Sequence, residues 1–403
     1  MRNDIKRKSS QVLLAVIGLA SSALLTPACA EDDVKIGFAT AMSGIFEAYD
    51  QEGVGMAEVF INDINAKGGI LGKKVTAIKV DTKSDRVQGT QAGAEVVAAG
   101  AKLVVVTCDY DFGSPAAVQA QKAGIVSVSL CAGDPKMGPV GVGSYAFSAG
   151  VAAPAEGFTH AQWAYNNRKY RNAYILLDDL IQYNKSVCSG FEWNWTKLGG
   201  KIVGKDTFKN FDPTIAAQTT RMVDANRADK IDVVMLCTFL PGGASAIKQI
   251  RAAGIDAPIM SGQAMGGTFW IGSIPNLSNF YADVVGSVVD DPRKPINELL
   301  AKYEKLHGKP LTQVGSFSIY AWLELWTRAI EKAGTFDAQK VVAIMNGYKD
   351  EPTSVQPYTF TPKVHIQAKT SLLITGIMDG KTSVVDQITL PEAVPDDVLF
   401  RQN

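Results

Sequence analysis

Short apolar runs alternate along the first part of the chain with longer stretches whose apolar residues recur every three or four positions. The run 34–40 is typical of a strand, and the spacing of the apolar positions in 57–64 is typical of a helix that ends at Gly68 and Gly69. Strands and helices in regular alternation predict a parallel sheet with helices on both faces. The strands expected in this part are 34–40, 73–81, 103–106 and 125–130, and the later helices are 85–99 and 114–123.

The same pattern restarts after a break near residues 148–155 and predicts a second α/β unit. A third block, 295–349, is helical in its periodicity, and short strands are expected over 357–376. Because no low-complexity linker separates the two units, we expect two doubly wound units in one chain. In the second unit the expected helices are 155–167, 184–198, 213–228 and 242–253, and the expected strands are 173–179, 201–208, 232–237 and 257–262.

The N-terminal residues 1–30 have the order of a secretory signal peptide. Basic residues precede the apolar stretch 11–25, and the small residues Ala28–Ala30 form a cleavage site. We expect cleavage after Ala30 and export of the mature chain. A buried N-terminal helix and lipidation of Cys29 are the alternatives, although Thr26 stands where a lipoprotein site prefers leucine.

Charge and length narrow the classes of function. The chain of 403 residues has 40 basic and 40 acidic side chains, and removal of residues 1–30 leaves a net charge of about −3. This balance offers no basic field for a nucleic acid partner. The mature length suits two cores. Four cysteines remain, and an even number in an exported protein favours disulfides over the alternative of buried thiols.

Polar and small residues follow the predicted strands, where open parallel sheets bind their ligands. In the first unit these segments are 108–112 and 131–134. Adjacent strands lie about 4.8 Å apart, so both segments are expected to face one crevice. The matching segments of the second unit are 178–183, 237–243 and 262–267.

Residues 61–85 resemble the periplasmic ligand-binding proteins of the branched-chain amino acid and amide type, the Leu/Ile/Val-binding protein-like family. The family phrase is a helix ending in Ile-Asn, then Gly-Gly-Ile-x-Gly-Lys, a strand and an Asp. Here it is present as Ile64 and Asn65, Gly68–Lys73, and Asp81. The resemblance extends over essentially the whole mature chain, through the further segments 42–53, 211–218, 232–236 and 247–254.

The resemblance implies a periplasmic binding protein of type I, in which two doubly wound, Rossmann-like lobes are joined by three hinge strands. Matching the order of elements puts the crossings near Ser148, Val285 and Leu373. The expected domains are the signal peptide 1–30, lobe 1 over 31–148 plus 286–372, and lobe 2 over 149–285 plus 373–403.

The resemblance also implies a function: an extracytoplasmic receptor of an ABC importer that captures a small solute between closing lobes and performs no chemistry. Its partners would be a small-molecule ligand and a membrane permease. We expect a periplasmic monomer without a cofactor or a metal. A sensor module of the same fold and a secreted hydrolase that uses Asp178 and Asp179 are the rival interpretations; the three histidines lack metal-ligand spacing, and no GxSxG elbow is present.

At the positions of the family's ligand loops, this chain has only some of the residue types that the family usually has. Where the family usually has Gly-x-Ser-Ser, which holds a carboxylate at a helix N-terminus, this chain has the acidic segment 109–114. This departure argues against a plain branched-chain amino acid, and the aromatic candidates suggest an apolar or aromatic organic acid, amino acid or amide. The residues expected to bind the ligand are Phe46, Tyr49, Tyr110, Asp111, Cys131, Ala132, Gly133, Tyr183, Thr238, Phe239, Gln263 and Met265.

The side chains of the segment 109–112 also have a structural interpretation. Asp109 and Asp111 are residues that commonly cap a helix, here one expected to begin near Ser114. Tyr110 and Phe112 are large enough to pack against their own lobe instead of a ligand.

The cysteines end or adjoin predicted strands. Cys108 and Cys131 end two neighbouring strands, close enough for a disulfide. Cys237 ends a strand in the second unit. Cys188 lies near the start of a helix that follows a neighbouring loop. We therefore expect the pairs 108–131 and 188–237.

Overall fold

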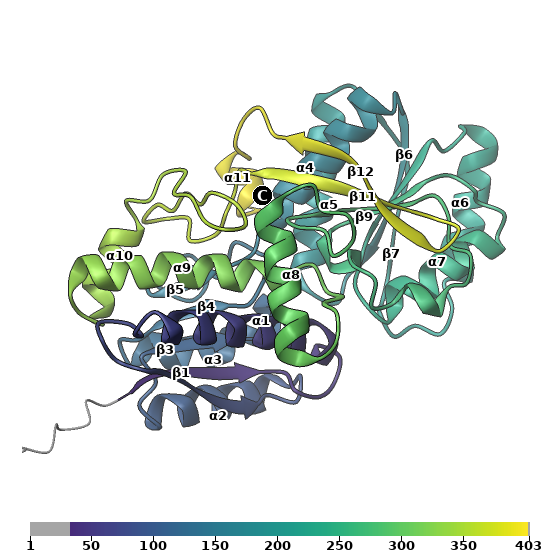
Figure 1. The fold of residues 1–403 in the computed structure, drawn as a ribbon. Coiled ribbons are helices and arrows are strands. Elements are labelled where there is room, and N and C mark those ends of the chain that lie inside the picture. The colour runs from purple at the N-terminus through teal and green to yellow at the C-terminus, as the bar shows by residue number, and fades with distance from the viewer. Residues whose placement is uncertain (1–32, 402–403) are drawn as a thin grey trace, which may run out of the picture. The chain divides into compact units, whose positions relative to one another are not determined.

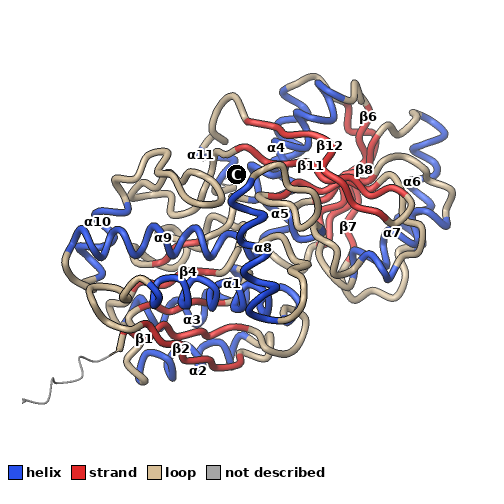
Figure 2. The backbone as a smooth tube through the Cα atoms, viewed as in Figure 1, coloured by secondary structure: helices blue, strands red, loops and turns tan. Residues whose placement is uncertain are grey.

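The computed structural model describes residues 33–401, so the expected signal peptide and Cys29 lie outside the described residues. The first sheet has five parallel strands in the order β2-β1-β3-β4-β5 (Figures 1 and 2). Its strands β3 and β4 are buried along their whole length, as expected for valine-rich runs covered on both faces. The strands are β1 (Val34–Thr40), β2 (Val75–Asp81), β3 (Leu103–Val106), β4 (Val126–Ser129) and β5 (Ala146–Ser148).

Helices cover both faces of this sheet. Side chains alternate along a strand, so Val104 and Val106 pack against α2 and α3, whereas Leu103 and Val105 belong to the core of α1 and α9. Trp322 of α9 is fully buried in that core. The helices are α1 (Glu47–Ala66), α2 (Arg86–Ala98), α3 (Tyr110–Lys122), α8 (Lys294–His307), α9 (Ser316–Ala333) and α10 (Ala338–Met345).

The turn that follows α1 requires a glycine for a steric reason. Gly69 has a φ of +79°, and a Cβ atom there would lie 1.8 Å from the carbonyl oxygen of Lys73. Only glycine tolerates both this backbone conformation and this close approach. The turn between α1 and β2 therefore depends on Gly69.

The second sheet has seven strands in the order β12-β11-β10-β9-β8-β6-β7. Ile175 of β6 faces the core of α4 and α5, whereas Leu176 faces α6 and α7. The strands are β6 (Asn172–Asp178), β7 (Lys201–Phe208), β8 (Val233–Cys237), β9 (Ile259–Ser261), β10 (Phe280–Val284), β11 (Ser371–Met378) and β12 (Lys381–Thr389). The helices are α4 (Ala153–Gln162), which continues as a π-helical turn over Trp163–Asn167, α5 (Gln182–Lys197), α6 (Ala216–Ala228), α7 (Gly242–Ala252) and α11 (Asp396–Leu399), with 3₁₀ turns at Gln263–Met265 and Ile271–Ser273.

Two expectations about this sheet were wrong. The alternation predicted only parallel strands, but β11 pairs antiparallel with β10 and with β12. Strands were expected over 357–376, but β11 begins at Ser371, and β12 was not predicted at all. Every second residue of β12 is exposed, because β12 is an edge strand with one solvated face. It therefore lacks the apolar run from which the other strands were predicted.

The chain passes between the sheets three times, after Ser148, after Val284 and before Ser371. These passages bring the strand-end loops of both sheets into one contact region, described below. Within residues 33–401, no helix has the length and apolar character needed to cross a bilayer.

Candidate functional site

A pocket lies where loops after strands of both sheets meet. The space between its lining atoms is about 410 Å³ when open solvent is counted, and about 30 Å³ of it is free for the centre of a water-sized molecule. The first sheet contributes the segments that follow β1, β3 and β4, and the second sheet those that follow β6, β8 and β9, as expected for the carboxyl ends of parallel strands. The lining residues are Phe46, Tyr49, Cys108, Asp109, Cys131, Gly133, Glu156, Ile181, Tyr183, Phe239, Gln263, Ala264 and Gln313.

Aromatic rings form one side of the pocket. Phe46, immediately before α1, stacks on Phe239 from the other sheet, with ring centroids 5.5 Å apart and planes at 8°. Phe112 packs on the same Phe46 ring at 4.9 Å. The backbone N–H of Phe46 donates to Ser84 Oγ at 3.0 Å, which fixes the start of α1. An apolar body of a ligand would therefore meet rings from both sheets.

The Tyr49 hydroxyl joins the loops of the two sheets. It accepts a hydrogen bond from the Leu240 N–H at 3.0 Å and donates to the Ala264 carbonyl at 3.2 Å. The side chain is buried, and this burial raises the pKa of Tyr49 above its ordinary value, so the hydroxyl stays protonated. It therefore fastens the two strand-end loops of the second sheet to α1.

Asp109 is the N-cap of α3. Its Oδ1 accepts from the Phe112 N–H at 3.0 Å, so α3 begins at Tyr110, four residues before the expected start at Ser114. Its Oδ2 is buried and has no hydrogen-bond partner among the described residues. Burial, and next the charge of Asp111, raise the pKa of Asp109 well above its usual range.

The early start of α3 moves Tyr110 and Asp111 out of the expected loop and into the first turn of the helix. Neither lines the pocket. Asp111 Oδ2 accepts from the Gln182 N–H at 2.7 Å, which connects α3 to the start of α5, and its Oδ1 lies 3.4 Å from Arg86 Nη2. Tyr110 is half-buried beside the alanine-rich core between α2 and α3. Their role in ligand binding stays a prediction.

Glu156 of α4 lines the pocket and was not among the expected site residues. Its Oε2 accepts from the Tyr183 hydroxyl at 2.6 Å and from the Gln263 N–H at 3.0 Å. Burial, and next the charge of Asp283, raise the pKa of Glu156 well above its ordinary value. Tyr183 in turn accepts from the Ala264 N–H at 3.1 Å, and burial followed by the Glu156 charge raises the pKa of Tyr183. A buried acid therefore holds two of the lining loops.

The cysteines form the two pairs that the sequence predicted. Cys108 and Cys131 are bonded across the ends of β3 and β4, with Cα atoms 4.6 Å apart, and both line the pocket. Cys188 and Cys237 are bonded beneath the loops of the second sheet, with Cα atoms 5.7 Å apart.

The Asp50 carboxyl group binds the backbone just after β1 and just after β3. It is fully buried, and its carboxyl oxygens accept from the Ala41 N–H at 2.6 Å and the Cys108 N–H at 2.8 Å. Burial raises the pKa of Asp50 to about 7.

Seven expected site residues line the pocket and five do not. Of those five, Thr238 donates to Asp178 Oδ2 at 3.0 Å, Ala132 is buried behind the loop, and Met265 packs into the core of α6 and α7. The expected residues that line it are Phe46, Tyr49, Cys131, Gly133, Tyr183, Phe239 and Gln263; Cys108, Asp109, Glu156, Ile181, Ala264 and Gln313 were missed.

The sequence offered a cue for only some of the missed residues. Cys108, Asp109, Ile181 and Ala264 lie within the predicted strand-end segments 108–112, 178–183 and 262–267, so their position was a usable indication. Glu156 lies inside a helix and Gln313 in the connection before α9, and neither belongs to a motif.

The acidic pair considered for hydrolysis lies elsewhere. Asp178 is buried and accepts hydrogen bonds from Asn210 Nδ2 and Thr238 Oγ1. Neither Asp178 nor Asp179 lines the pocket. Among residues 33–401, no three or more His, Cys, Asp or Glu side chains are grouped so that they could hold a metal ion.

Comparison with known proteins identifies a family and a fold. Residues 33–381 match the model of a family described as periplasmic binding protein. The Leu/Ile/Val-binding protein BraC3 of Rhizobium johnstonii is 25% identical over 334 residues, which cover 82% of this chain and 88% of that protein. The Leu/Ile/Val-binding protein of Escherichia coli K12 is 27% identical over 356 residues, 87% of this chain and 88% of that protein.

Solved structures share the fold at lower identity. The branched-chain amino acid transporter substrate-binding protein LivJ of Streptococcus pneumoniae, in complex with isoleucine, superposes with a TM-score of 0.77 at 20% identity, over 89% of this chain and 100% of that one. A solute-binding protein of an ABC transporter from Rhodopseudomonas palustris, in complex with 3,4-dihydroxybenzoic acid, gives a TM-score of 0.74 at 20% identity, over 91% and 99%.

Proposed function

Because the chain belongs to the periplasmic binding protein family, we propose that it is an extracytoplasmic solute-binding receptor of an ABC importer. It captures a small solute in the pocket and presents the closed form to a membrane permease. The observation that carries this proposal is that both sheets contribute strand-end loops to one pocket. The names of its relatives, which include Leu/Ile/Val-binding proteins, point the same way.

The proposal divides the chain at its three passages between the sheets. Lobe 1 is 31–148 plus 286–372 and lobe 2 is 149–285 plus 373–403. Residues such as Phe46 and Phe239 meet across the lobes, so a solute held between them contacts both lobes only when these are closed. The solute then shifts the equilibrium toward closure by its difference in affinity for the two states.

The receptor is a monomer of the periplasm, exported by the segment 1–30, and it carries out no turnover. The buried hydrogen bonds of Asp178 disfavour the hydrolase interpretation, because this carboxyl group is already engaged by Asn210 and Thr238. A sensor module of the same fold is the remaining rival, and it differs only in the partner that recognises the closed form.

The ligand has an apolar body that packs on Phe46 and Phe239. Among the structural neighbours, one binds isoleucine and others 3,4-dihydroxybenzoic acid and benzoate. These solutes share a small size and an apolar part. We infer the same size class for this receptor.

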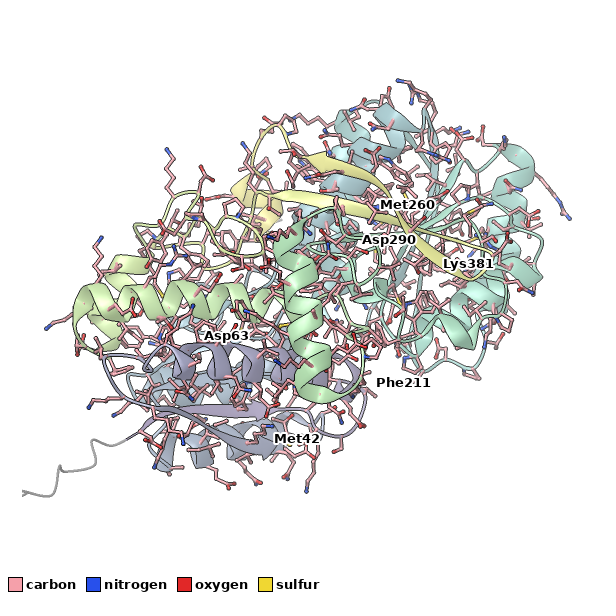
Figure 3. All side chains as sticks on the ribbon, viewed as in Figure 1. Met42, Asp63, Phe211, Met260, Asp290 and Lys381 are labelled. Atoms are coloured by element: carbon pink, nitrogen blue, oxygen red, sulfur yellow. A yellow bond between two sulfur atoms is a disulfide. The ribbon has the colours of Figure 1, made fainter. Side chains whose placement is uncertain are left out.

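A thermal-shift screen of metabolites tests the proposal. A ligand at 100 times its Kd adds about 2.7 kcal/mol to the free energy of unfolding, which raises the Tm measurably. Hits should bind one per chain by calorimetry, bind more weakly to Phe239→Ala, and come back chemically unchanged. As a matched control, Phe211→Ala removes a ring that is 58% exposed on the surface (Figure 3) and should bind like the parent. A broad library without hits, or hits indifferent to Phe239→Ala, would contradict the proposal.

A further inference from the structure

Among the residues that the structure describes, the pocket lining includes acidic side chains and no basic ones. Asp109 and Glu156 are the ionisable acids that line it, and its described lining includes no lysine, arginine or histidine. Both side chains are almost fully buried, with 2% and 1% exposed. A solute in this pocket therefore meets carboxyl groups without meeting a basic side chain.

The basic side chains near this region are already used elsewhere. Arg86 is paired with Asp111, Arg401 Nη2 donates to Asp134 Oδ2 at 2.9 Å, and Lys136 Nζ donates to Gln182 Oε1 at 3.3 Å. Asp111 and Asp134 are the acids whose charges act on Asp109. They add to the negative potential at this position, which disfavours an anion there.

One oxygen of Asp109 lacks a partner. Oδ1 caps α3 through the Phe112 N–H, but the buried Oδ2 has no hydrogen-bond partner among residues 33–401. A buried carboxylate oxygen without a donor is costly. Since Asp109 lines the pocket, a donor group on a bound solute could satisfy this oxygen.

The N-terminus of α3 does not offset this charge for a ligand. A helix N-terminus attracts anions, but Asp109 itself occupies that position and takes up the Phe112 N–H. A ligand carboxylate would have to approach Asp109 directly. In its ionised form Asp109 would repel that carboxylate in a site with little water.

The remaining lining favours a positive group as well. Phe46, Tyr49, Tyr183 and Phe239 bring four aromatic side chains to the pocket. Phe46 and Phe239 each cover one face of the other, and the faces that remain attract cations, more strongly when water is excluded. Aromatic rings together with buried carboxylates are the combination that recognises ammonium groups.

We propose that this pocket selects solutes with a primary ammonium group on a small apolar body and without a carboxylate, the ammonium donating to Asp109 Oδ2. This inference rests on the proposed function and specifies its ligand class. Glu156 adds a second negative charge while it holds Tyr183 and Gln263. Burial raises the pKa of both acids, and an incoming cation stabilises their charged forms.

Two matched sets of probes separate charge from shape. Leucine without its carboxylate is 3-methylbutylamine, leucine without its amino group is 4-methylpentanoate, and 3-methylbutan-1-ol is a neutral analogue. Phenylalanine, 2-phenylethylamine, 3-phenylpropanoate and 2-phenylethanol form the aromatic set. Calorimetry at neutral pH and low salt measures each affinity. We expect an amine to bind most tightly of its set, and the acids to bind at least about tenfold more weakly.

Amino acid substitutions show which carboxyl groups cause the preference for amines. Asp109→Asn keeps the cap through its amide oxygen but removes the charge, and it should weaken amine binding about tenfold or more while leaving the alcohols unchanged. Glu156→Gln, which keeps an acceptor for Tyr183, should also weaken it. Asp85→Asn is the matched control, because Asp85 caps α2 in the same way, through the Val87 and Gln88 N–H groups, and does not line the pocket.

The outcomes distinguish this inference from the function on which it rests. If acids bind as tightly as amines and lose affinity in Phe239→Ala, the receptor function stands and the ammonium preference is wrong. Equal amine affinity in the parent, Asp109→Asn and Glu156→Gln would overturn the inference, and so would the failure of both amines to bind. The receptor function itself is judged by the broader metabolite screen.

Discussion

The ring of Phe46 lies parallel to the ring of Phe239, although one precedes the first helix of the chain and the other follows a strand of the second sheet. Under the proposed lobe division one ring belongs to each lobe, so this stacking joins the two lobes. It places an apolar surface from each lobe against the same pocket. Ligand affinity and closure should therefore depend on the same two side chains.

Replacing Phe239 with alanine should weaken ligand binding by about 2 kcal/mol, or roughly thirtyfold in Kd. The variant loses the ring that stacks on Phe46 and that we expect to contact the apolar body of the solute. Calorimetry with the tightest ligand measures the change. Phe211→Ala should leave Kd unchanged, and an equal loss in both variants would mean that the pocket is not the binding site.

Replacing Tyr49 with phenylalanine should weaken binding by about 1–2 kcal/mol. The variant leaves the Leu240 N–H and the Ala264 carbonyl without the hydroxyl that joins them in the closed form. Tyr320→Phe is the matched control, because its hydroxyl donates to Asp63 within lobe 1, at 2.7 Å. That control should lose stability without losing affinity; a Tyr49→Phe variant with the affinity of the parent would contradict this role.

Replacing Cys108 and Cys131 together with serine should lower the free energy of unfolding by about 3 kcal/mol, since the bond closes a short loop. Because both residues line the pocket, ligand affinity should fall as well. The Cys188 and Cys237 double variant serves as the comparison: Cys188 and Cys237 are bonded outside the pocket lining, so it should lose stability with less effect on affinity. Non-reducing peptide mapping that finds Cys108 joined to a lobe 2 cysteine would refute the pairing.

Asp50 should make stability depend on pH. Its pKa is raised to about 7 in the folded protein by burial, from 3.8. The folded state therefore binds this proton more tightly than the unfolded chain, so the contribution is complete below about pH 4 and is lost as the pH rises through about 7. The free energy of unfolding measured in urea for the parent, minus that for Asp50→Asn, should fall by about 2.6 kcal/mol between about pH 5 and about pH 8. A constant or growing difference would contradict it.

The sequence predicted the α/β class and the two-unit order from the alternation of strand and helix patterns. Valine-rich runs such as residues 103–106 are typical of strands that are covered on both faces of a sheet. The sequence also placed Phe46, Tyr183 and Phe239 near a common crevice, because strand ends of parallel sheets share one edge. The antiparallel β12 escaped prediction because an edge strand with one solvated face has no such run.

The position of Glu156 could not be predicted, because it depends on how closely two helices approach. A Cβ atom on Gly157 would lie 2.2 Å from the Val187 carbonyl oxygen, and one on Gly190 would lie 2.2 Å from that of Pro154. This close contact of α4 and α5 turns Glu156 toward the loops after β6 and β9. The start of α3 was misplaced for a related reason, since the cap by Asp109 is a local hydrogen bond that periodicity does not reveal.

Small-angle X-ray scattering of the protein with and without its tightest ligand tests the central claim, capture of a solute between two closing lobes, most directly. We expect the radius of gyration to fall when the ligand saturates the protein, and to fall less in Tyr49→Phe. A radius that stays unchanged at saturation, with binding verified by calorimetry in the same sample, would contradict this claim.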